Sequence, residues 1–190
     1  AWCWKESASV GFDIVSWTGS DGGGSNTKNI SHNLGVIPSL VIVKNRSSAI
    51  DWIVKSSSLS SGKILYLNDQ SGEDGATGTN NGIVADLDSS SHFTLTRTGN
   101  TGNWNCVDKD GDNYIGYVFA NVEGYCKAGT YHGNGSSDGT QVYTGFKPAF
   151  IMVKNIEGSG DWVMIDAKRT TGNPNAKGIH ANENSAEYNT

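Results

Sequence analysis

GVIPSLVIVKNRSSAIDWIV, residues 35–54, returns as GFKPAFIMVKNIEGSGDWVM at residues 145–164. Each copy holds two short apolar runs joined by a polar connection, which is the pattern of a β-hairpin. Over residues 35–52 the copies align without a gap and share seven residues. These are Gly35, Pro38, Val43, Lys44, Asn45, Asp51 and Trp52, matched by Gly145, Pro148, Val153, Lys154, Asn155, Asp161 and Trp162. The stretch predicts that the chain contains one hairpin twice.

The match extends upstream of the hairpins, with a short insertion. Residues 11–12 (GF) parallel residues 124–125 (GY), and residues 17–19 (WTG) parallel residues 131–133 (YHG). We therefore expect an internal duplication with a repeat of about 110 residues. Residues 1–10 would end a preceding unit or form a linker strand, residues 11–123 would be the first β unit, and residues 124–190 an incomplete second unit. Both ends are expected to be cuts from a longer polypeptide.

The composition favours an all-β fold of antiparallel β-sandwich-type units. Of 190 residues, 25 are glycine, and charged residues make up 17%, below the usual quarter. Short apolar runs bounded by Gly, Asn and Ser recur, and long helical periods are hard to find. The expected strands are residues 39–45, 51–57, 63–68, 82–87, 92–98, 113–122, 141–145, 149–155 and 161–167.

Two kinds of strand are distinguished by their side chains. In residues 92–98, Phe93 and Leu95 alternate with polar residues, which predicts one buried face. Residues 41–43 (VIV) and 151–153 (IMV) are apolar at every position, which predicts that both faces are covered, in the centre of a sandwich or at a subunit contact.

Charge and hydropathy limit the partners. The net charge is −5 and the basic residues are scattered singly, so no stripe exists to neutralise nucleic-acid phosphates. No apolar run approaches the roughly 20 residues of a membrane span. Exposed β-edges need a cover, which symmetric neighbours supply, so a homo-oligomer is expected.

One acidic segment is a candidate calcium site. Asp108, Asp110 and Asp112 occupy alternate positions in VDKDGDNY, so three carboxylates could surround one Ca²⁺. The segment is not an EF-hand, because it lacks that loop's glycine at position 6 and glutamate at position 12. The alternative is a polar turn in which Gly111 has a positive φ and the aspartates point apart into water. No other cofactor is expected.

Aromatic and acidic pairs are candidates for glycan binding. Trp17 and Tyr131 each precede a polar Gly/Ser-rich loop, and a ring beside polar groups can stack on a sugar. Asp51-Trp52 and Asp161-Trp162 could serve in the same way. The alternative is structural, because each tryptophan begins a strand, where a large ring can cover the end of a core.

Evidence for catalysis is weak. The sequence has no G-x-S-x-G, H-E-x-x-H or P-loop motif. Its four histidines, which stand apart in the sequence, are expected at the surface: His32, His92, His132 and His180. Cys3, Cys106 and Cys126 are odd in number and lack C-x-x-C spacing, so they support neither a zinc site nor a disulfide framework. We expect no enzyme.

The motifs also resemble a known family. AWCWK, GFDIVSWTG, the first hairpin, YIGYVFANVEGY and the segment from GTYHGNGSSDG to GDWVMIDAKRT together resemble a β-rich domain of unknown function. That domain is found in tail-fibre and other virion proteins of bacteriophages, especially marine and cyanobacterial phages. The resemblance covers nearly the whole chain, and CVDKDGD departs from it by being more acidic.

The resemblance implies a non-enzymatic virion protein, located on the virion and so extracellular. It would be a tail-fibre or surface module that supports host attachment, with glycan binding as one means, and a trimer if it is a fibre. One alternative is a decoration or assembly subunit that binds other virion proteins and no host ligand. A secreted glycan-active enzyme is the third reading.

Overall fold

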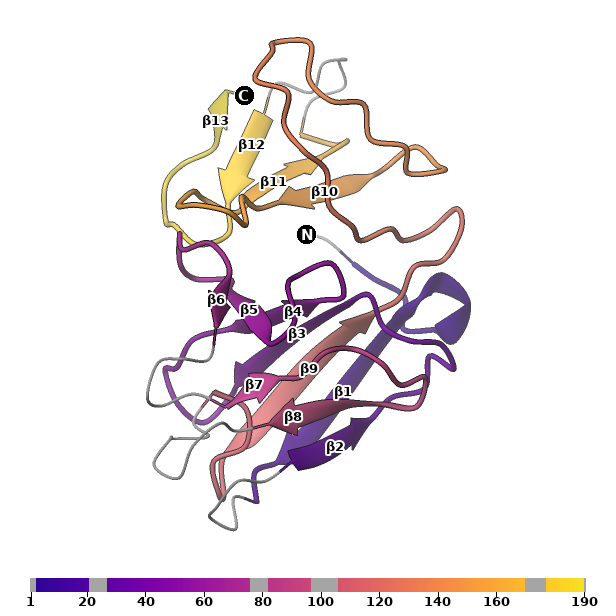
Figure 1. Ribbon diagram of the computed structural model, residues 1–190, viewed down its shortest axis with the longest axis vertical. Helices are drawn as coiled ribbons and strands as arrows, with labels where there is room; N and C mark the ends of the chain where they lie inside the picture. The colour runs from indigo at the N-terminus through magenta and orange to yellow at the C-terminus, as the bar shows by residue number, and fades with distance from the viewer. Residues whose placement is uncertain (1–2, 21–26, 76–81, 97–105, 170–176, 190) are drawn as a thin grey trace.

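The computed structural model describes residues 3–20, 27–75, 82–96, 106–169 and 177–189. Its regular structure is nearly all antiparallel β-sheet, as predicted, with one short 3-10 helix, η1 (Ala8–Val10) (Figure 1). Within these ranges no helix has the length and hydropathy needed to cross a bilayer.

The largest sheet has six strands in the order β1-β9-β3-β4-β5-β6. They are β1 (Phe12–Thr18), β3 (Leu40–Asn45), β4 (Ile53–Ser56), β5 (Lys63–Tyr66), β6 (Asp74–Gly75) and β9 (Asn113–Phe119). The strand that comes last in the sequence therefore lies between β1 and β3. A three-stranded sheet, in the order β2-β8-β7, contains β2 (Thr27–Ser31), β7 (Ile83–Val84) and β8 (His92–Thr96).

The first core lies between these two sheets. Val41 and Val43 of β3 pack toward Phe93 and Leu95 of β8, and all four side chains are buried. The predicted alternation is therefore confirmed for residues 92–96, and residues 97–98 lie outside the described residues. Each sheet hides its apolar face against the other, which removes apolar surface from water and stabilises the fold.

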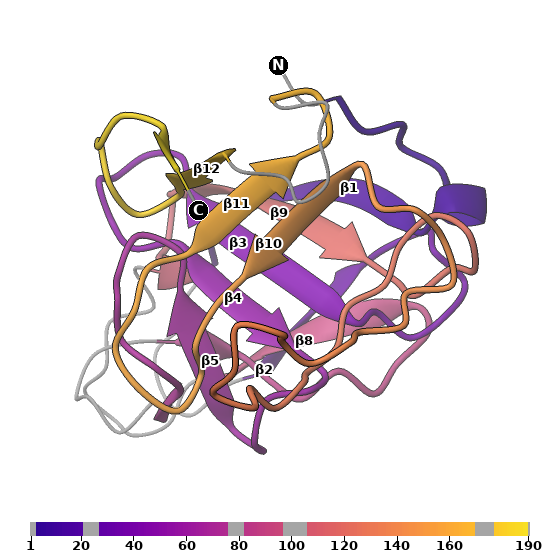
Figure 2. The ribbon, with the colours of Figure 1, turned by 90° about the horizontal axis from the view of Figure 1, so that it is seen from above.

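The other face of the six-stranded sheet carries a second core. Ile42, Val54 and Leu65 point to this side and pack with Trp162 of the four-stranded sheet β10-β11-β12-β13. That sheet contains β10 (Phe150–Val153), β11 (Val163–Asp166), β12 (Lys177–His180) and β13 (Tyr188–Asn189). Figure 2 shows β10 and β11 lying over β3 and β4. Residues 41–43 are thus covered on both faces, as expected.

The four-stranded sheet repeats the pairing of β3 to β6. Val43 pairs with Ile53, and Val153 pairs with Val163, so both partners are displaced by 110 residues (153 − 43 and 163 − 53). The same displacement relates all four residue pairs of the β3–β4 and β10–β11 hairpins. Each hairpin is preceded by a glycine with positive φ, Gly35 (69°) and Gly145 (84°).

The later strands follow the same rule with a displacement of 114. Ile64 pairs with Asp74, and Gly178 pairs with Tyr188 (178 − 64 and 188 − 74). Val54–Leu65 and Met164–Ile179 are likewise equivalent pairs between the second and third strands of each sheet. The pattern of partners in β3 to β6 therefore recurs in β10 to β13.

Two sequence expectations fail in the second half. Residues 141–145, expected as a strand, contain none, and no strand occurs anywhere in residues 127–149. A strand persists only when its backbone groups have a partner. Ile151, expected to be covered, is 43% exposed, because no further sheet lies on its side of β10 among the described residues.

A buried lysine was not anticipated from the sequence. Lys55 of β4 is 1% exposed, and its Nζ donates to Asp86 at 2.6 Å and to the Lys63 carbonyl at 2.8 Å. Hydrogen bonds from Lys55, and then from Ser61 and the Gly62 amide, lower the pKa of Asp86 to about 2. A buried ammonium group requires such partners.

This pair predicts acid sensitivity. Because the folded-state pKa of Asp86 lies below its ordinary 3.8, its contribution to stability is present above that pH and is lost as pH falls toward 2. Urea unfolding at a series of pH values should show this loss. Asp86→Asn should lower the free energy of unfolding at neutral pH by roughly 1–3 kcal/mol. It should also make that free energy depend less on pH in acid. Asp88→Asn alters an exposed aspartate nearby and should keep the wild-type dependence of stability on pH. If both variants gave the same dependence, the acid sensitivity could not be attributed to Asp86.

The second core predicts a difference between the repeated tryptophans. Trp162→Ala should lower the free energy of unfolding by about 3–5 kcal/mol, because the ring is 4% exposed and its removal leaves a cavity. Trp52→Ala should cost less, because that ring is only half-buried. Denaturant titration measures both, with Tyr143→Ala, at a residue 85% exposed, as a control near zero. A larger loss from Trp52→Ala than from Trp162→Ala would contradict this account.

Candidate functional site

The repeated Asp-Trp pairs form the same hydrogen-bonded bracket in both hairpins. The Asn68 side chain accepts from the Trp52 backbone N–H at 2.8 Å and donates to Asp51 at 2.8 Å. Asn182 makes the equivalent bonds to Trp162 (2.8 Å) and Asp161 (2.7 Å). The bracket ties the start of one strand to the end of the next, so both aspartates have a structural task.

Neither tryptophan of these pairs has a ring face free to stack on a sugar. The Trp162 Nε1 donates to the Tyr66 carbonyl at 2.8 Å, which fixes the buried ring against β5. Trp52 stacks on Tyr117 at a centroid distance of 6.5 Å, with Lys44 Nζ 5.9 Å from its ring centroid. Burial therefore argues against Trp162 as a sugar-stacking residue, and internal contacts occupy Trp52.

Trp17 and Tyr131 lie in different surroundings. Trp17 stacks on Tyr114 at 5.4 Å and donates from Nε1 to the Val107 carbonyl at 3.0 Å, so it belongs to the first core. Tyr131 is 50% exposed and lies in the strand-free residues 127–149. Of the tentative glycan residues, Tyr131 alone keeps half of its surface open.

The acidic segment has the positive φ at Gly111 that the turn predicts, but not all of its aspartates point into water as that prediction had them. Asp108 is buried and pairs with Lys28 Nζ at 2.7 Å, whereas Asp112 accepts from Asn45 Nδ2 at 2.8 Å. Asp110 is exposed, and Gly111 has a φ of 77°. Among the described residues the three carboxylates form no group able to hold a metal. Their separate partners leave the calcium hypothesis without a geometric basis here.

The prediction that all four histidines lie at the surface is wrong for His32. This residue is buried, its Nδ1 accepts from the Leu34 N–H at 3.3 Å, and burial lowers its pKa. Its neighbours in sequence are polar, so no local pattern marks it as a core residue. Burial also raises the pKa of Cys106 to about 12, which keeps this thiol protonated at neutral pH.

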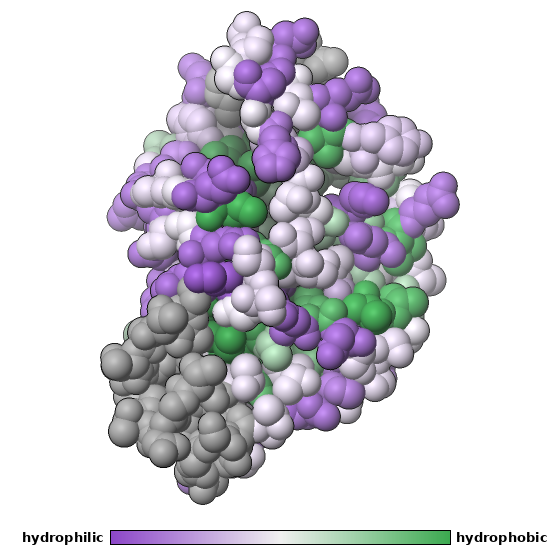
Figure 3. Space-filling model, in the orientation of Figure 1, coloured by the Kyte–Doolittle hydropathy of each residue, from purple (hydrophilic) through white to green (hydrophobic). Residues whose placement is uncertain are grey.

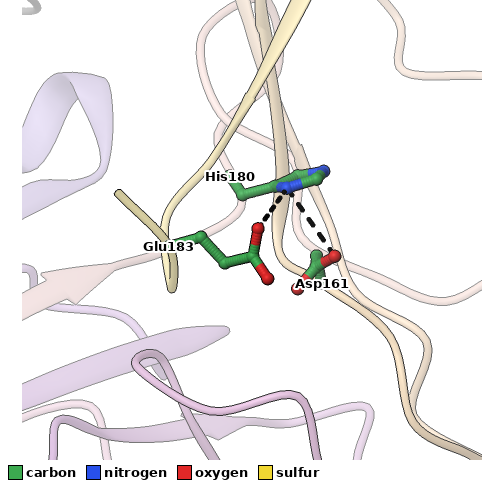
Figure 4. Close-up of side chains that lie close together, drawn as sticks. All are labelled: Asp161, His180 and Glu183. Carbon is green, nitrogen blue, oxygen red and sulfur yellow. Dashed lines mark hydrogen bonds and ion pairs between the residues drawn. The ribbon is translucent and has the colours of Figure 1, made fainter. Parts of the chain in front are cut away.

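One cluster brings together three groups that can bind a metal: Asp161, His180 and Glu183. His180 Nδ1 lies 3.3 Å from Glu183 Oε2 and 3.6 Å from Asp161 Oδ2 (Figure 4). Asp161 precedes β11, His180 ends β12, and Glu183 follows in the connection to β13. All three ligand atoms lie within 4.8 Å of one another, and the first two residues are half-buried.

Amide groups complete this cluster and link it to the first half of the chain. Gln70 Nε2, from the connection between β5 and β6, donates to Asp161 Oδ1 at 2.7 Å and to Glu183 Oε1 at 3.2 Å. Hydrogen bonds from Asn182 and Gln70 lower the pKa of Asp161. Both carboxylates thus accept from Gln70 with one oxygen and face His180 with the other.

The cluster allows two uses. A protonated Nδ1 can donate to Glu183 Oε2, with Asp161 Oδ2 nearby at 3.6 Å, and Gln70 joins the two carboxylates across the two halves of the chain. With Nδ1 deprotonated, one nitrogen and two oxygens within 4.8 Å of one another form a donor set that suits Zn²⁺. Ligands about 2.0–2.2 Å from a tetrahedral ion lie roughly 3.3–3.5 Å apart, close to the distances from Nδ1.

Sequence reasoning found Asp161 but missed His180 and Glu183. The signal was present in the repeat: with the displacement of 114, Tyr66 corresponds to His180 and Asp69 to Glu183. The bracket residues are retained in both copies, whereas these two positions change. A comparison restricted to the gapless part of the repeat does not reach them.

The two metal hypotheses predict different melting curves. We expect Zn²⁺ to raise the Tm by binding the folded state, and His180→Gln to abolish that rise. The matched control is Asp69→Asn, because Asp69 follows β5 at the position equivalent to Glu183. This variant should respond to Zn²⁺ like wild type. Ca²⁺ and EDTA should leave the Tm unchanged, because Asp108 and Asp112 have protein partners. A Tm insensitive to Zn²⁺ would leave the cluster as a hydrogen-bonded ring alone.

Comparison with known proteins gives a family. No curated protein and no solved structure is significantly similar to the chain. The model of the family described as "Domain of unknown function (DUF7483)" matches residues 1–190. Because this match spans the whole sequence, the chain belongs to the DUF7483 family of domains of unknown function.

Proposed function

We propose that this chain is a non-enzymatic structural module of a bacteriophage virion, part of a tail fibre or similar surface protein, that acts by binding other polypeptides. The virion assignment rests on the motif resemblance, and a virion surface location follows from it. The binding role rests on one observation, the exposed apolar side chains within residues 125–151.

These side chains gather in the second half of the chain. Tyr125 (65% exposed), Tyr131 (50%), Val142 (51%) and Tyr143 (85%) precede β10, and Ile151 (43%) lies on it. On the face shown in Figure 3, hydrophobic residues surface in separate patches among hydrophilic ones. Aromatic residues are enriched in surfaces that bind other proteins.

The proposal that the chain is not an enzyme is supported by the partners of its aspartates, several of which bond to other groups of the protein. Asp51 and Asp161 hold the hairpin brackets, Asp86 neutralises Lys55, and Asp108 pairs with Lys28. A general acid or base must reach a substrate proton. Because these carboxylates already bond to asparagine or lysine side chains, they favour a structural role over a catalytic one.

We further propose that the chain arose by duplication of a β-sandwich-type unit, the second copy represented here by one sheet. The equivalent registers at displacements of 110 and 114, and the repeated bracket, support this proposal. The two hairpins differ in burial, because Val41 lies in the first core whereas the equivalent Ile151 is exposed.

The proposed binding role predicts self-association. Light scattering over a range of concentrations should show a homo-oligomer, a trimer if the module belongs to a fibre. Ile151→Lys should lower the measured mass, because a charge would disrupt an apolar contact. Ile14→Lys, at a residue of the first unit that is 39% exposed, is the matched control. A monomer at every concentration, or equal effects of both variants, would count against self-association through this surface.

Two further assays separate the alternatives. A glycan array should give binding if the module attaches to a host sugar, for which Tyr131 is the best-placed ring; a decoration or assembly subunit gives no signal. Incubation with host polysaccharide should release no oligosaccharide. Any release would instead favour a glycan-active enzyme.

A further inference from the structure

The two residues that join Asp161 in its cluster are not needed for the hairpin to form. The first hairpin has the same bracket of aspartate, asparagine and tryptophan, with Tyr66 and Asp69 at the positions of His180 and Glu183. The bracket of the second hairpin is likewise complete with its own asparagine. The hairpin fold therefore does not account for a histidine and a glutamate beside Asp161.

One oxygen of each carboxylate faces the same ring nitrogen. His180 Nδ1 lies 3.3 Å from Glu183 Oε2, but 3.6 Å from Asp161 Oδ2, which is too long for a hydrogen bond (Figure 4). Two ligands of a tetrahedral Zn²⁺ lie roughly 3.3–3.5 Å apart. Both distances from Nδ1 are close to that separation, and the two oxygens lie within 4.8 Å of each other.

The other oxygen of each carboxylate is held by amide groups. Gln70 Nε2 donates to Asp161 Oδ1 at 2.7 Å and to Glu183 Oε1 at 3.2 Å, and Asn182 Nδ2 donates to Asp161 Oδ1 at 2.7 Å. Ser185 Oγ donates to Glu183 Oε2 at 3.2 Å. Hydrogen bonds of this kind orient carboxylates that bind a metal.

The imidazole is positioned by β13. The centroid of the His180 ring lies 4.5 Å from that of Tyr188, and His180 and Asp161 are half-buried, whereas Glu183 is exposed. The cluster is therefore partly shielded from water but accessible to an ion on the side of Glu183. One imidazole nitrogen with two carboxylate oxygens favours Zn²⁺ over Ca²⁺, which takes about six to eight oxygen ligands.

Gln70 links this cluster to the first half of the chain. Its carbonyl accepts from the Gly160 N–H at 2.8 Å and from Lys154 Nζ at 3.0 Å, while the Glu73 N–H donates to the Ile156 carbonyl at 2.7 Å. The connection between β5 and β6 thus lies against the connection between β10 and β11. An ion that orders the two carboxylates also orders the Gln70 amide that bonds to both.

We infer that Asp161, His180 and Glu183 bind one Zn²⁺ through Oδ2, Nδ1 and Oε2, and that the ion stabilises the contact of the four-stranded sheet with the first half of the chain. Water occupies the fourth position, because three protein ligands leave one position of a tetrahedral ion open. This metal site goes beyond the proposed binding of polypeptides, and neither depends on the other.

Isothermal titration of the full chain with Zn²⁺, after treatment with EDTA and removal of the chelator, tests the ligands. Wild type should bind one ion per chain. His180→Gln and Glu183→Gln should each weaken binding by more than about tenfold, because loss of even an outer partner of a metal ligand costs that much. His132→Gln and Cys3→Ser alter exposed residues elsewhere that could also bind zinc, and both should bind it like wild type.

A further variant and a second measurement test the link between the halves. Gln70→Ala keeps all three ligands, so it should still bind one ion, with an affinity lower by roughly 10- to 100-fold. Zn²⁺ should also slow amide hydrogen exchange in residues 67–73 and 154–160 of wild type, but not in Glu183→Gln.

Two results would overturn the metal site: no saturable binding of Zn²⁺ by wild type, or equal affinities of wild type and the two ligand variants. Circular dichroism checks that each variant is folded. Because Glu183 is exposed, Glu183→Gln keeps the test decisive even if His180→Gln does not fold. Binding of one ion without slower exchange in residues 67–73 would overturn the stabilising role of the metal at the contact between the halves.

Discussion

Burial of both faces of the β3–β4 hairpin is the constraint on which the rest of this structure depends. Adjacent residues of one strand, Val41 and Ile42, point to opposite sides and are both removed from water. A strand that is apolar on both faces must lie between two layers. The three-stranded sheet covers one side, and the four-stranded sheet covers the other. The second half of the chain is therefore part of the packing of the first.

The polar side chains that suggested chemistry serve mainly to satisfy this β-architecture. Asn68 and Asn182 each join an aspartate to the backbone of a tryptophan, and Asn45 joins Asp112 to Tyr114. Buried or half-buried backbone groups must find partners, and short amide and carboxylate side chains provide them where ladders end. The Asp161–His180–Glu183 cluster differs, because Tyr66 and Asp69 stand at the positions equivalent to His180 and Glu183, and only Asp161 is retained, as Asp51.

The two halves contain hairpins of equivalent register whose surroundings differ. In the first, β9 and the three-stranded sheet cover the outer edge and face of β3. In the second, the equivalent edge and face belong to β10, where Ile151 and the aromatic residues before it meet solvent. This difference connects the fold to the proposed function, because exposed apolar side chains are the basis on which we propose a binding role.

The sequence by itself determined the β-class, the two hairpins and most strand positions, because hairpin registers depend on short-range alternation and turn residues. It also indicated, through the apolar run at residues 41–43, that one strand is covered on both sides. Only the tertiary structure decided the rest. The insertion of β9 between β1 and β3, the burial of Lys55 and His32, and the absence of a strand at residues 141–145 all depend on distant partners. The cluster shows this most directly, because Gln70 meets Asp161 across 91 residues of chain. Such contacts are selected by the packing of whole sheets, which no local pattern encodes.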